Sequence, residues 1–143
     1  MQGRRYWFLV CVDGYSRFMV LAEQFDHEPR TGEVTALLER QRRYPKVMLS
    51  DHGSQFRERW EKWCRRNGVE PHFAHPFYLQ DKGKVERCIQ SLNREFVNHL
   101  REFPEWLKGK LQEYREWFNH SRFHIGVKAL PADLYECIVR NLT

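Results

Sequence analysis

An apolar run with no polar alternation opens the chain and predicts its first strand. Tyr6 to Val12 is rich in aromatic and β-branched side chains, a pattern typical of a central strand that is buried on both faces. The run ends at Asp13, and residues 13–16 have the composition of a turn. Three more segments predict strands: one or two strands over residues 18–25, and one strand each over 47–50 and 69–73.

Apolar side chains recur at helical spacing in the segments between and after these strands. We expect Thr31 and Ser54 to cap the first two helices, and Pro131 to begin a short last helix. The predicted helices are identified by their apolar positions: Val34, Leu37 and Leu38; Phe56, Trp60, Trp63 and Cys64; Val85, Ile89, Leu92 and Phe96; and, after Pro104, Leu107, Leu111, Tyr114 and Phe118.

Residues 75–83 carry no apolar periodicity and are predicted to form a loop. This segment contains Pro, Gly, Gln and Asp, and Gly83 is expected to let the chain pivot just before the next helix. No linker, repeat or low-complexity segment divides the sequence. We therefore expect residues 1–143 to form one α/β domain, with a central mixed sheet flanked by helices.

Composition and charge narrow the classes of function. The longest apolar run has seven residues, far short of the roughly 20 needed to cross a bilayer, so a membrane protein is not expected. The chain has 24 Lys and Arg against 19 Asp and Glu, a net charge of +5, which favours a polyanionic partner such as DNA. Its four cysteines form no CxxC pair and fit reduced core thiols in an intracellular protein.

Three acidic residues are candidates for a metal site. Asp13 and Asp51 each follow directly on a predicted strand, and Glu86 lies in the first turn of a later predicted helix. Ligands bind beyond the carboxyl ends of strands in open α/β sheets, and three carboxylates without a cysteine pair favour Mg²⁺ or Mn²⁺ over zinc. Spacing alone leaves open that strand-end aspartates are ordinary turn residues.

The residues around these acids resemble a known family. The sequences YWFLVCVDGYSRF, LSDHGSQF and HP followed by QDKGKVER match, in order, the three acidic motifs of the catalytic core shared by retroviral integrases and insertion-sequence transposases. WFNHSRFHIG, followed by LPA, is similar to the closing segment of insertion-sequence transposases. The resemblance covers nearly the whole chain and implies a ribonuclease H-like fold.

This resemblance implies a site and a reaction. Asp13, Asp51 and Glu86 would be the catalytic acids and would hold two Mg²⁺ or Mn²⁺ ions with DNA bound. The enzyme would nick DNA ends and join the freed 3′-OH to target DNA, as a homodimer or higher oligomer, inside the cell and in the cytoplasm or nucleoid if prokaryotic. Relatives usually carry additional N- and C-terminal DNA-binding domains, which are expected to be absent from residues 1–143.

Candidate DNA contacts lie around the third acid. Lys82, Lys84 and Arg87 flank Glu86 and are suited to hold phosphates. Related helices often place Lys or Arg one or two turns after the glutamate, whereas this chain has Gln90 and Asn93 there, with Arg94 slightly off that line. A weaker grip on DNA is expected.

Two alternative functions remain open at this point. The first is a non-catalytic module that uses the same fold to bind DNA or protein. The second is a metal-dependent nuclease without strand transfer, which three acids alone do not exclude. Among the tryptophans, Trp60 and Trp63 are expected in the core, whereas Trp106 and Trp117 are candidates for a contact with a second subunit.

Overall fold

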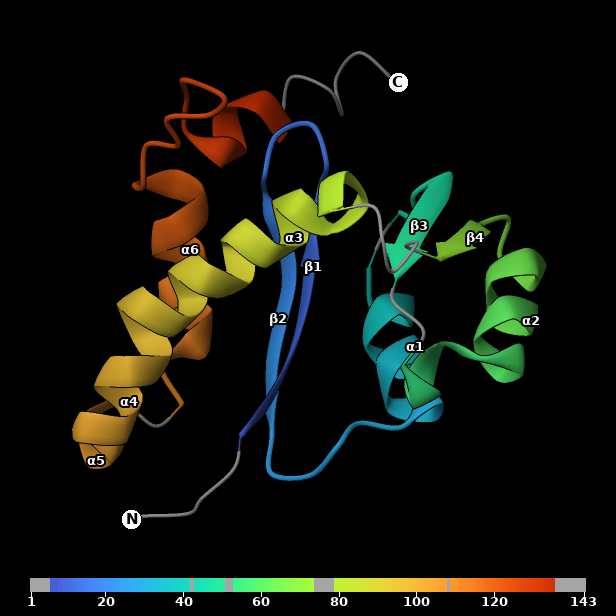
Figure 1. The fold of residues 1–143 in the computed structure, drawn as a ribbon, viewed down its shortest axis with the longest axis horizontal. Helices are drawn as coiled ribbons and strands as arrows, with labels where there is room; N and C mark the ends of the chain where they lie inside the picture. Colours follow the sequence, from blue (N-terminus) through green and yellow to red (C-terminus); the bar gives the residue numbers. More distant parts are fainter. Residues whose placement is uncertain (1–5, 42, 51–52, 74–78, 108, 136–143) are drawn as a thin grey trace.

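A computed structural model describes residues 6–41, 43–50, 53–73, 79–107 and 109–135 of the chain (Figure 1). Its strands are β1 (Trp7–Val12), β2 (Met19–Phe25), β3 (Val47–Ser50) and β4 (Glu70–Phe73). Its helices are α1 (Thr31–Glu39), α2 (Glu58–Arg66), α3 (Leu79–Leu92), α4 (Asn98–Glu102), α5 (Pro104–Leu107) and α6 (Leu111–His120). A 3₁₀ turn spans Ser54–Phe56, a π-helical turn over Asn93–Val97 joins α3 to α4, and residues 131–135 are helical.

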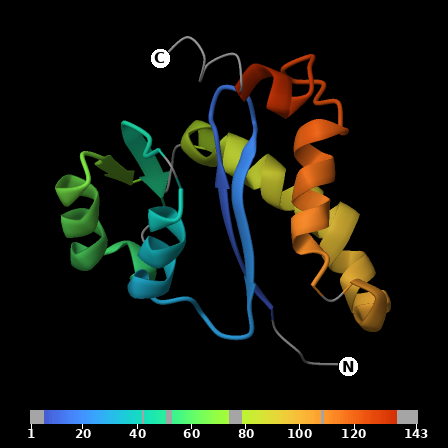
Figure 2. The same cartoon turned by 180° about the vertical axis from the view of Figure 1, so that it is seen from behind.

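The four strands form two pairs. β1 and β2 are antiparallel, with Trp7 opposite Phe25, and β3 and β4 are parallel, with Val47 opposite Glu70. The β1–β2 hairpin runs through the middle of the molecule, with α4 and α6 on one side of it and α1, α2 and the β3–β4 pair on the other (Figures 1 and 2). The α/β class predicted from the sequence is confirmed.

β1 lies between two hydrophobic cores. Phe8, Val10 and Val12 pack against a core built from β2, from α6 and from the helical stretch of α3, the π-helical turn and α4. Leu9 and Cys11 pack against a second core, built from α1, α2, Val69 and Leu21 of β2. Because alternate side chains enter different cores, the strand has no polar face, as the sequence predicted. Its residues are nevertheless only half-buried, so the expectation of full burial was wrong. The 47–50 strand is also partly exposed, with Val47 47% and Leu49 41% exposed.

Several helix boundaries differ from the predictions. α1 has Arg30, not Thr31, at its N-cap; the Thr31 hydroxyl instead donates a 2.8 Å hydrogen bond to the carbonyl oxygen of Gln55. Ser54 begins the 3₁₀ turn, and α2 starts only at Glu58. The single helix expected after Pro104 is two helices, because Gly109 has a φ of +79° that no helix continues through.

The predicted loop over residues 75–83 is wrong in its second half. α3 already begins at Leu79, so Gly83 lies within the helix and is not a pivot in front of it. Residues 74–78 lie outside the described part of the chain. The first turns of α3 form although their sequence has no apolar periodicity. Backbone hydrogen bonds can extend a helix whose later turns are anchored by an apolar face.

The tryptophans of α2 are buried as predicted, with Trp60 1% and Trp63 7% exposed. Their rings stack with centroids 5.6 Å apart, and the Trp63 indole N–H donates a 2.9 Å hydrogen bond to Glu39. Across the described residues, no helix combines the length and apolar character required to cross a membrane.

Candidate active site

The first predicted acid, Asp13, lies in a tightly bonded turn between β1 and β2. Its Oδ2 atom accepts hydrogen bonds from the Ser16 backbone N–H at 2.8 Å and from the Ser16 hydroxyl at 2.6 Å. Ser16 is completely buried, which fixes the direction of the Asp13 carboxylate. Both hydrogen bonds engage the Oδ2 atom of Asp13.

Backbone hydrogen bonds close the same turn. The Asp13 N–H donates to the carbonyl oxygen of Phe18 at 2.9 Å, and the Arg17 N–H donates to the carbonyl oxygen of Asp13 at 2.9 Å. Arg17 takes the left-handed backbone conformation, with a φ of 65°. Just beyond the turn Val12 pairs with Met19 while Cys11 pairs with Leu21, so Val20 is an extra residue on β2. Such bulges bend a strand and often re-aim side chains beside active sites.

A cation from α3 is bonded to this turn. The Lys84 ammonium donates a 2.9 Å hydrogen bond to the carbonyl oxygen of Gly14, and the Arg17 guanidinium donates to the same oxygen. Cys88, one turn after Lys84, is buried in the core that β1 lines. The turn that carries Asp13 and the helix that carries Glu86 are therefore directly connected.

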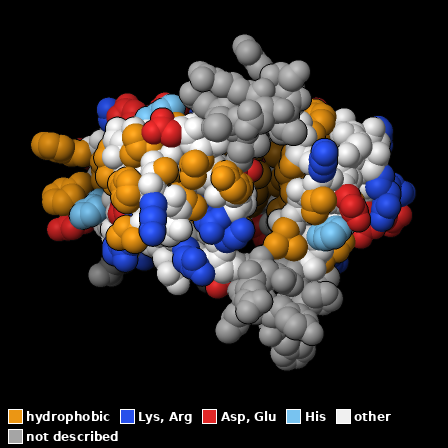
Figure 3. All heavy atoms as spheres, turned by 90° about the horizontal axis from the view of Figure 1, so that it is seen from above, with side chains coloured by type: hydrophobic (Ala, Val, Ile, Leu, Met, Phe, Trp, Pro, Cys, Tyr) orange, Lys and Arg blue, Asp and Glu red, His pale blue; other side chains and the backbone are white. Residues whose placement is uncertain are grey.

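The exposed side of α3 and of the π-helical turn that follows it carries Glu86 and most of the predicted DNA contacts. Glu86 is exposed, and so are Arg87, Gln90, Asn93 and Arg94. Gln90 and Asn93, four and seven residues after Glu86, follow it along one line of the helix, whereas Arg87 and Arg94 lie to one side of that line. Seen from above the view of Figure 1, Lys and Arg side chains gather beside a hollow in which small patches of acidic side chains are visible (Figure 3).

The second acid, Asp51, lies outside the described residues, and so does the neighbouring His52. Lys82 lies within α3, and its side chain is outside the described part of the structure. Within the described ranges no group of three or more His, Cys, Asp or Glu side chains could hold a metal ion. Because Asp51 is not among them, the triad of Asp13, Asp51 and Glu86 stays a prediction.

The chemistry of the donor atoms fits a hard cation. Asp13 and Glu86 offer carboxylate oxygens, the ligands that Mg²⁺ and Mn²⁺ prefer. The thiols nearby are not available as thiolates: burial, and secondarily the charge of Asp13, raises the pKa of Cys11 to about 11, and burial raises the pKa of Cys88 to about 12. A zinc-type thiolate site is disfavoured beside Asp13.

Aromatic side chains from the C-terminal part of the chain pack against Phe18, next to the Asp13 turn. Tyr135 stacks on Phe18 with ring centroids 4.2 Å apart, and the edge of His120 meets the same Phe18 ring at 6.3 Å. Burial, followed by the charge of Asp13, raises the pKa of Tyr135. Burial and the positive charges of Arg122, Arg17 and Arg87 lower the pKa of His124.

Sequence reasoning missed three contributors to this site. Ser16 orients Asp13, Lys84 bonds the turn as well as being a candidate phosphate contact, and Tyr135 stacks on Phe18 at the end of the turn. Ser16 belongs to the Tyr-Ser-Arg sequence that the resemblance had singled out, so its signal was present. Tyr135 follows Asp13 by more than a hundred residues, and no local pattern links the two.

Comparison with solved structures places this architecture among integrase catalytic cores. The catalytic core domain of BIV integrase superposes with a TM-score of 0.74 at 23% identity, over 96% of this chain and 90% of that one. A chain of the simian T-cell lymphotropic virus intasome, solved with the PP2A regulatory subunit B56 gamma, gives a TM-score of 0.76 at 18% identity. That match covers 91% of this chain but only 48% of the viral chain. The ribonuclease H-like fold predicted from the sequence is confirmed.

The sequence itself also matches a family model. The model of the integrase core domain matches residues 1–78, more than half of the 143 residues. The chain therefore belongs to the integrase core domain family. No curated protein matches it significantly.

Proposed function

We propose that this chain is the catalytic core of a DNA-integrating or transposing enzyme, a polynucleotidyl transferase that nicks DNA ends and joins the freed 3′-OH to target DNA. Its membership of the integrase core domain family supports the class of reaction. One observation supports the proposed site residues: the hydrogen bond from Lys84 to Gly14 connects the helix of Glu86 to the turn of Asp13.

In this proposal Asp13, Asp51 and Glu86 hold Mg²⁺ or Mn²⁺, with two ions when DNA is bound. Bound ions of this kind activate an attacking oxygen and neutralise charge on a leaving oxygen. The chain supplies the geometry. Ser16 keeps the Asp13 carboxylate in one orientation through its two hydrogen bonds to Oδ2.

Phosphate binding falls to the basic and polar residues around Glu86. Arg87 on α3 and Arg94 on the following π-helical turn carry charge at exposed positions, and Gln90 and Asn93 offer amide hydrogen bonds on the same elements. We include Lys82 and Lys84 for their positions in the first turns of the same helix. Contacts of this type fix the register of DNA without reading its sequence. The partner is DNA inside the cell, in the cytoplasm or nucleoid if prokaryotic, and the working form is a homodimer or larger assembly.

The test is an assay with labelled oligonucleotides that separates hydrolysis from joining, run with Mg²⁺ and with Mn²⁺. Both products are expected from the wild-type chain, and Asp51→Asn should reduce both to background while keeping the wild-type circular dichroism spectrum and cooperative melting. Glu58→Gln, an exposed acid on α2, is the matched control and should retain activity.

Other outcomes would point to the alternatives. Cleavage without joining would identify a metal-dependent nuclease. DNA binding without either product would identify a non-catalytic module. Equal activity in wild type and Asp51→Asn would remove the proposed acidic triad.

A further inference from the structure

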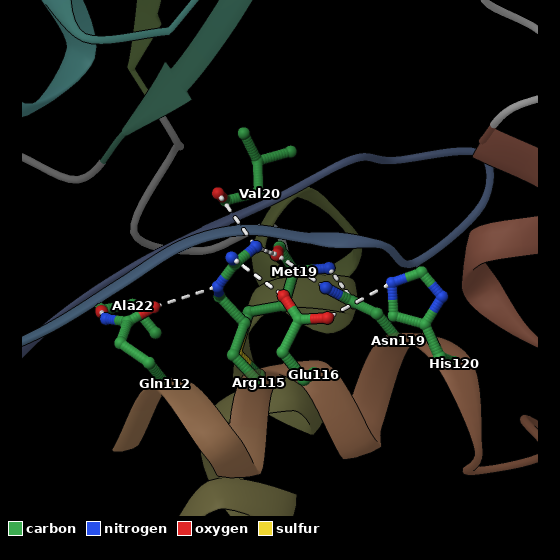
Figure 4. A network of polar contacts seen from close by, with 8 residues as sticks. All are labelled: Met19, Val20, Ala22, Gln112, Arg115, Glu116, Asn119 and His120. Atoms are coloured by element: carbon green, nitrogen blue, oxygen red, sulfur yellow. Dashed lines mark hydrogen bonds and ion pairs between the residues drawn. The ribbon is translucent and has the colours of Figure 1, made fainter. Parts of the chain in front are cut away.

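The closing motif resembles that of insertion-sequence transposases, yet the proposed function gives its asparagine no role. Asn119 lies near the end of α6 and is completely buried. Buried amides require hydrogen-bond partners, and those of Asn119 are the two backbone groups of one residue. Its Oδ1 accepts the Met19 N–H at 2.7 Å, and its Nδ2 donates to the Met19 carbonyl oxygen at 3.0 Å (Figure 4).

This pairing reproduces the two hydrogen bonds that a neighbouring strand would make with Met19. Two other side chains of α6 extend the contact along β2. Gln112 donates to the carbonyl oxygen of Ala22 at 2.6 Å, and Arg115 donates to the carbonyl oxygen of Met19 at 3.2 Å (Figure 4). Side chains of one helix thus cover backbone groups of β2.

Asn119 differs from Gln112 because its hydrogen bond with the Met19 N–H is linked to the Asp13 turn. The Met19 N–H belongs to the same peptide group as the Phe18 carbonyl, and that carbonyl accepts the Asp13 N–H at 2.9 Å. The peptide is planar, so fixing its N–H side fixes its carbonyl side. Bonds in such a chain also polarise and strengthen one another.

The side chain of Phe18 is held from the same helix. The His120 ring, adjacent to Asn119, meets Phe18 edge-on, while Tyr135 stacks on the Phe18 ring. Asn119 therefore restrains the peptide group of Phe18, and His120 and Tyr135 restrain its ring. A single hydrogen bond joins that peptide group to the backbone of Asp13.

We infer that Asn119 is a positioning residue for Asp13: through the peptide between Phe18 and Met19 it sets the backbone position from which the Asp13 carboxylate reaches a divalent cation. This inference rests on the proposed function of Asp13 as a metal ligand. Asn119 itself does not contact the reacting groups.

The test compares Asn119→Ala with Gln112→Ala. Both variants remove hydrogen bonding from α6 to β2, two bonds in the first and one in the second, and only the first acts on the Asp13 turn. Amide hydrogen exchange at Asp13 should accelerate about five-fold in Asn119→Ala, the effect of losing roughly one net hydrogen bond, and stay at the wild-type rate in Gln112→Ala. The Mn²⁺ concentration that gives half of the maximal rise in melting temperature should increase by a similar factor in Asn119→Ala only.

A structural role alone predicts lower melting temperatures for both variants with the wild-type Mn²⁺ midpoint, and that result would overturn the inference. Asn119→Ser, which keeps a small hydrogen-bonding group, should fall between Ala and wild type, and it replaces Ala if Asn119→Ala fails to fold. A wild-type chain with no Mn²⁺ response at all would overturn the proposed function. In that case the rate of amide hydrogen exchange at Asp13 still decides whether Asn119 restrains the backbone of Asp13.

Discussion

The ammonium group of Lys84 lies 2.9 Å from the carbonyl oxygen of Gly14, and this bond joins residues that are 70 positions apart in the sequence. It attaches the first half of α3 to the turn that directly follows β1. Two of the three predicted catalytic acids, Asp13 and Glu86, are each within two residues of its ends.

Replacing Lys84 with Gln should therefore affect activity more than stability. The bond is exposed, so its loss should cost about 0.5–1 kcal/mol of unfolding free energy, whereas a small displacement of α3 from Asp13 should lower the rate of DNA cleavage roughly tenfold. Lys62→Gln removes an exposed lysine that pairs with Glu58 at 3.0 Å and is the control. Melting temperature and cleavage rate are the measurements, and equal rates in both variants would contradict the role of the bond.

Divalent cations should stabilise the folded chain, because they bind carboxylates that only folding brings together. At ten times its dissociation constant, a single bound ion adds about 1.4 kcal/mol, a rise of roughly 3–6 °C in melting temperature for a domain of this size. Differential scanning fluorimetry with and without Mn²⁺ measures this rise. Glu86→Gln should reduce it, and an unchanged rise in that variant would exclude Glu86 as a ligand.

Acidification should destabilise the fold through His124. Burial and the charges of Arg122, Arg17 and Arg87 lower the pKa of His124 in the folded chain, so the unfolded chain binds its proton more readily. The stabilisation by neutral His124 is complete above the unfolded pKa of about 6.5 and is lost as the pH falls below it. Urea unfolding at pH 7.5 and pH 5.5 should show a smaller loss of stability in His124→Asn than in wild type. An equal or larger loss would contradict the shift.

The tryptophan on α5 should mediate self-association. Trp106 is 81% exposed, and joining two DNA ends requires two active sites, so a buried aromatic anchor between subunits is expected there. Light scattering at high protein concentration should detect a dimer for wild type and a monomer for Trp106→Ser. Ile125→Ser, which removes another exposed apolar side chain at 83% exposure, should leave the dimer intact. A monomeric wild-type chain would count against this surface, though not against the chemistry.

The sequence by itself predicted most of the strands and helices and named the candidate acids of the site. The unbroken apolar run of β1 identified a strand with two apolar faces, because its alternate side chains enter separate cores. Asp13 could be located directly after that strand because strand ends follow from residue order. Glu86 was correctly assigned to a helix, but α3 begins at Leu79, so Glu86 lies beyond the first turn in which it was predicted. The ordered motifs also identified the family to which the chain belongs.

The sequence predicted the ends of the helices less accurately, because several local signals compete at a helix end. Thr31 is a good cap residue, yet its hydroxyl bonds Gln55 and Arg30 takes the cap position. Gly109 breaks a helix that apolar spacing alone would continue, since its positive φ outweighs the periodicity of Leu107 and Leu111.

Only the tertiary structure decided how the distant parts of the site are held. The pairing of Asn119 with Met19 and that of Lys84 with Gly14 join positions 100 and 70 residues apart. A buried amide or an ammonium group can bond many backbone groups, and sequence does not say which one. The choice follows from the packing of α3 and α6 against the β1–β2 hairpin, where the hydrophobic core brings each side chain within reach of one backbone group.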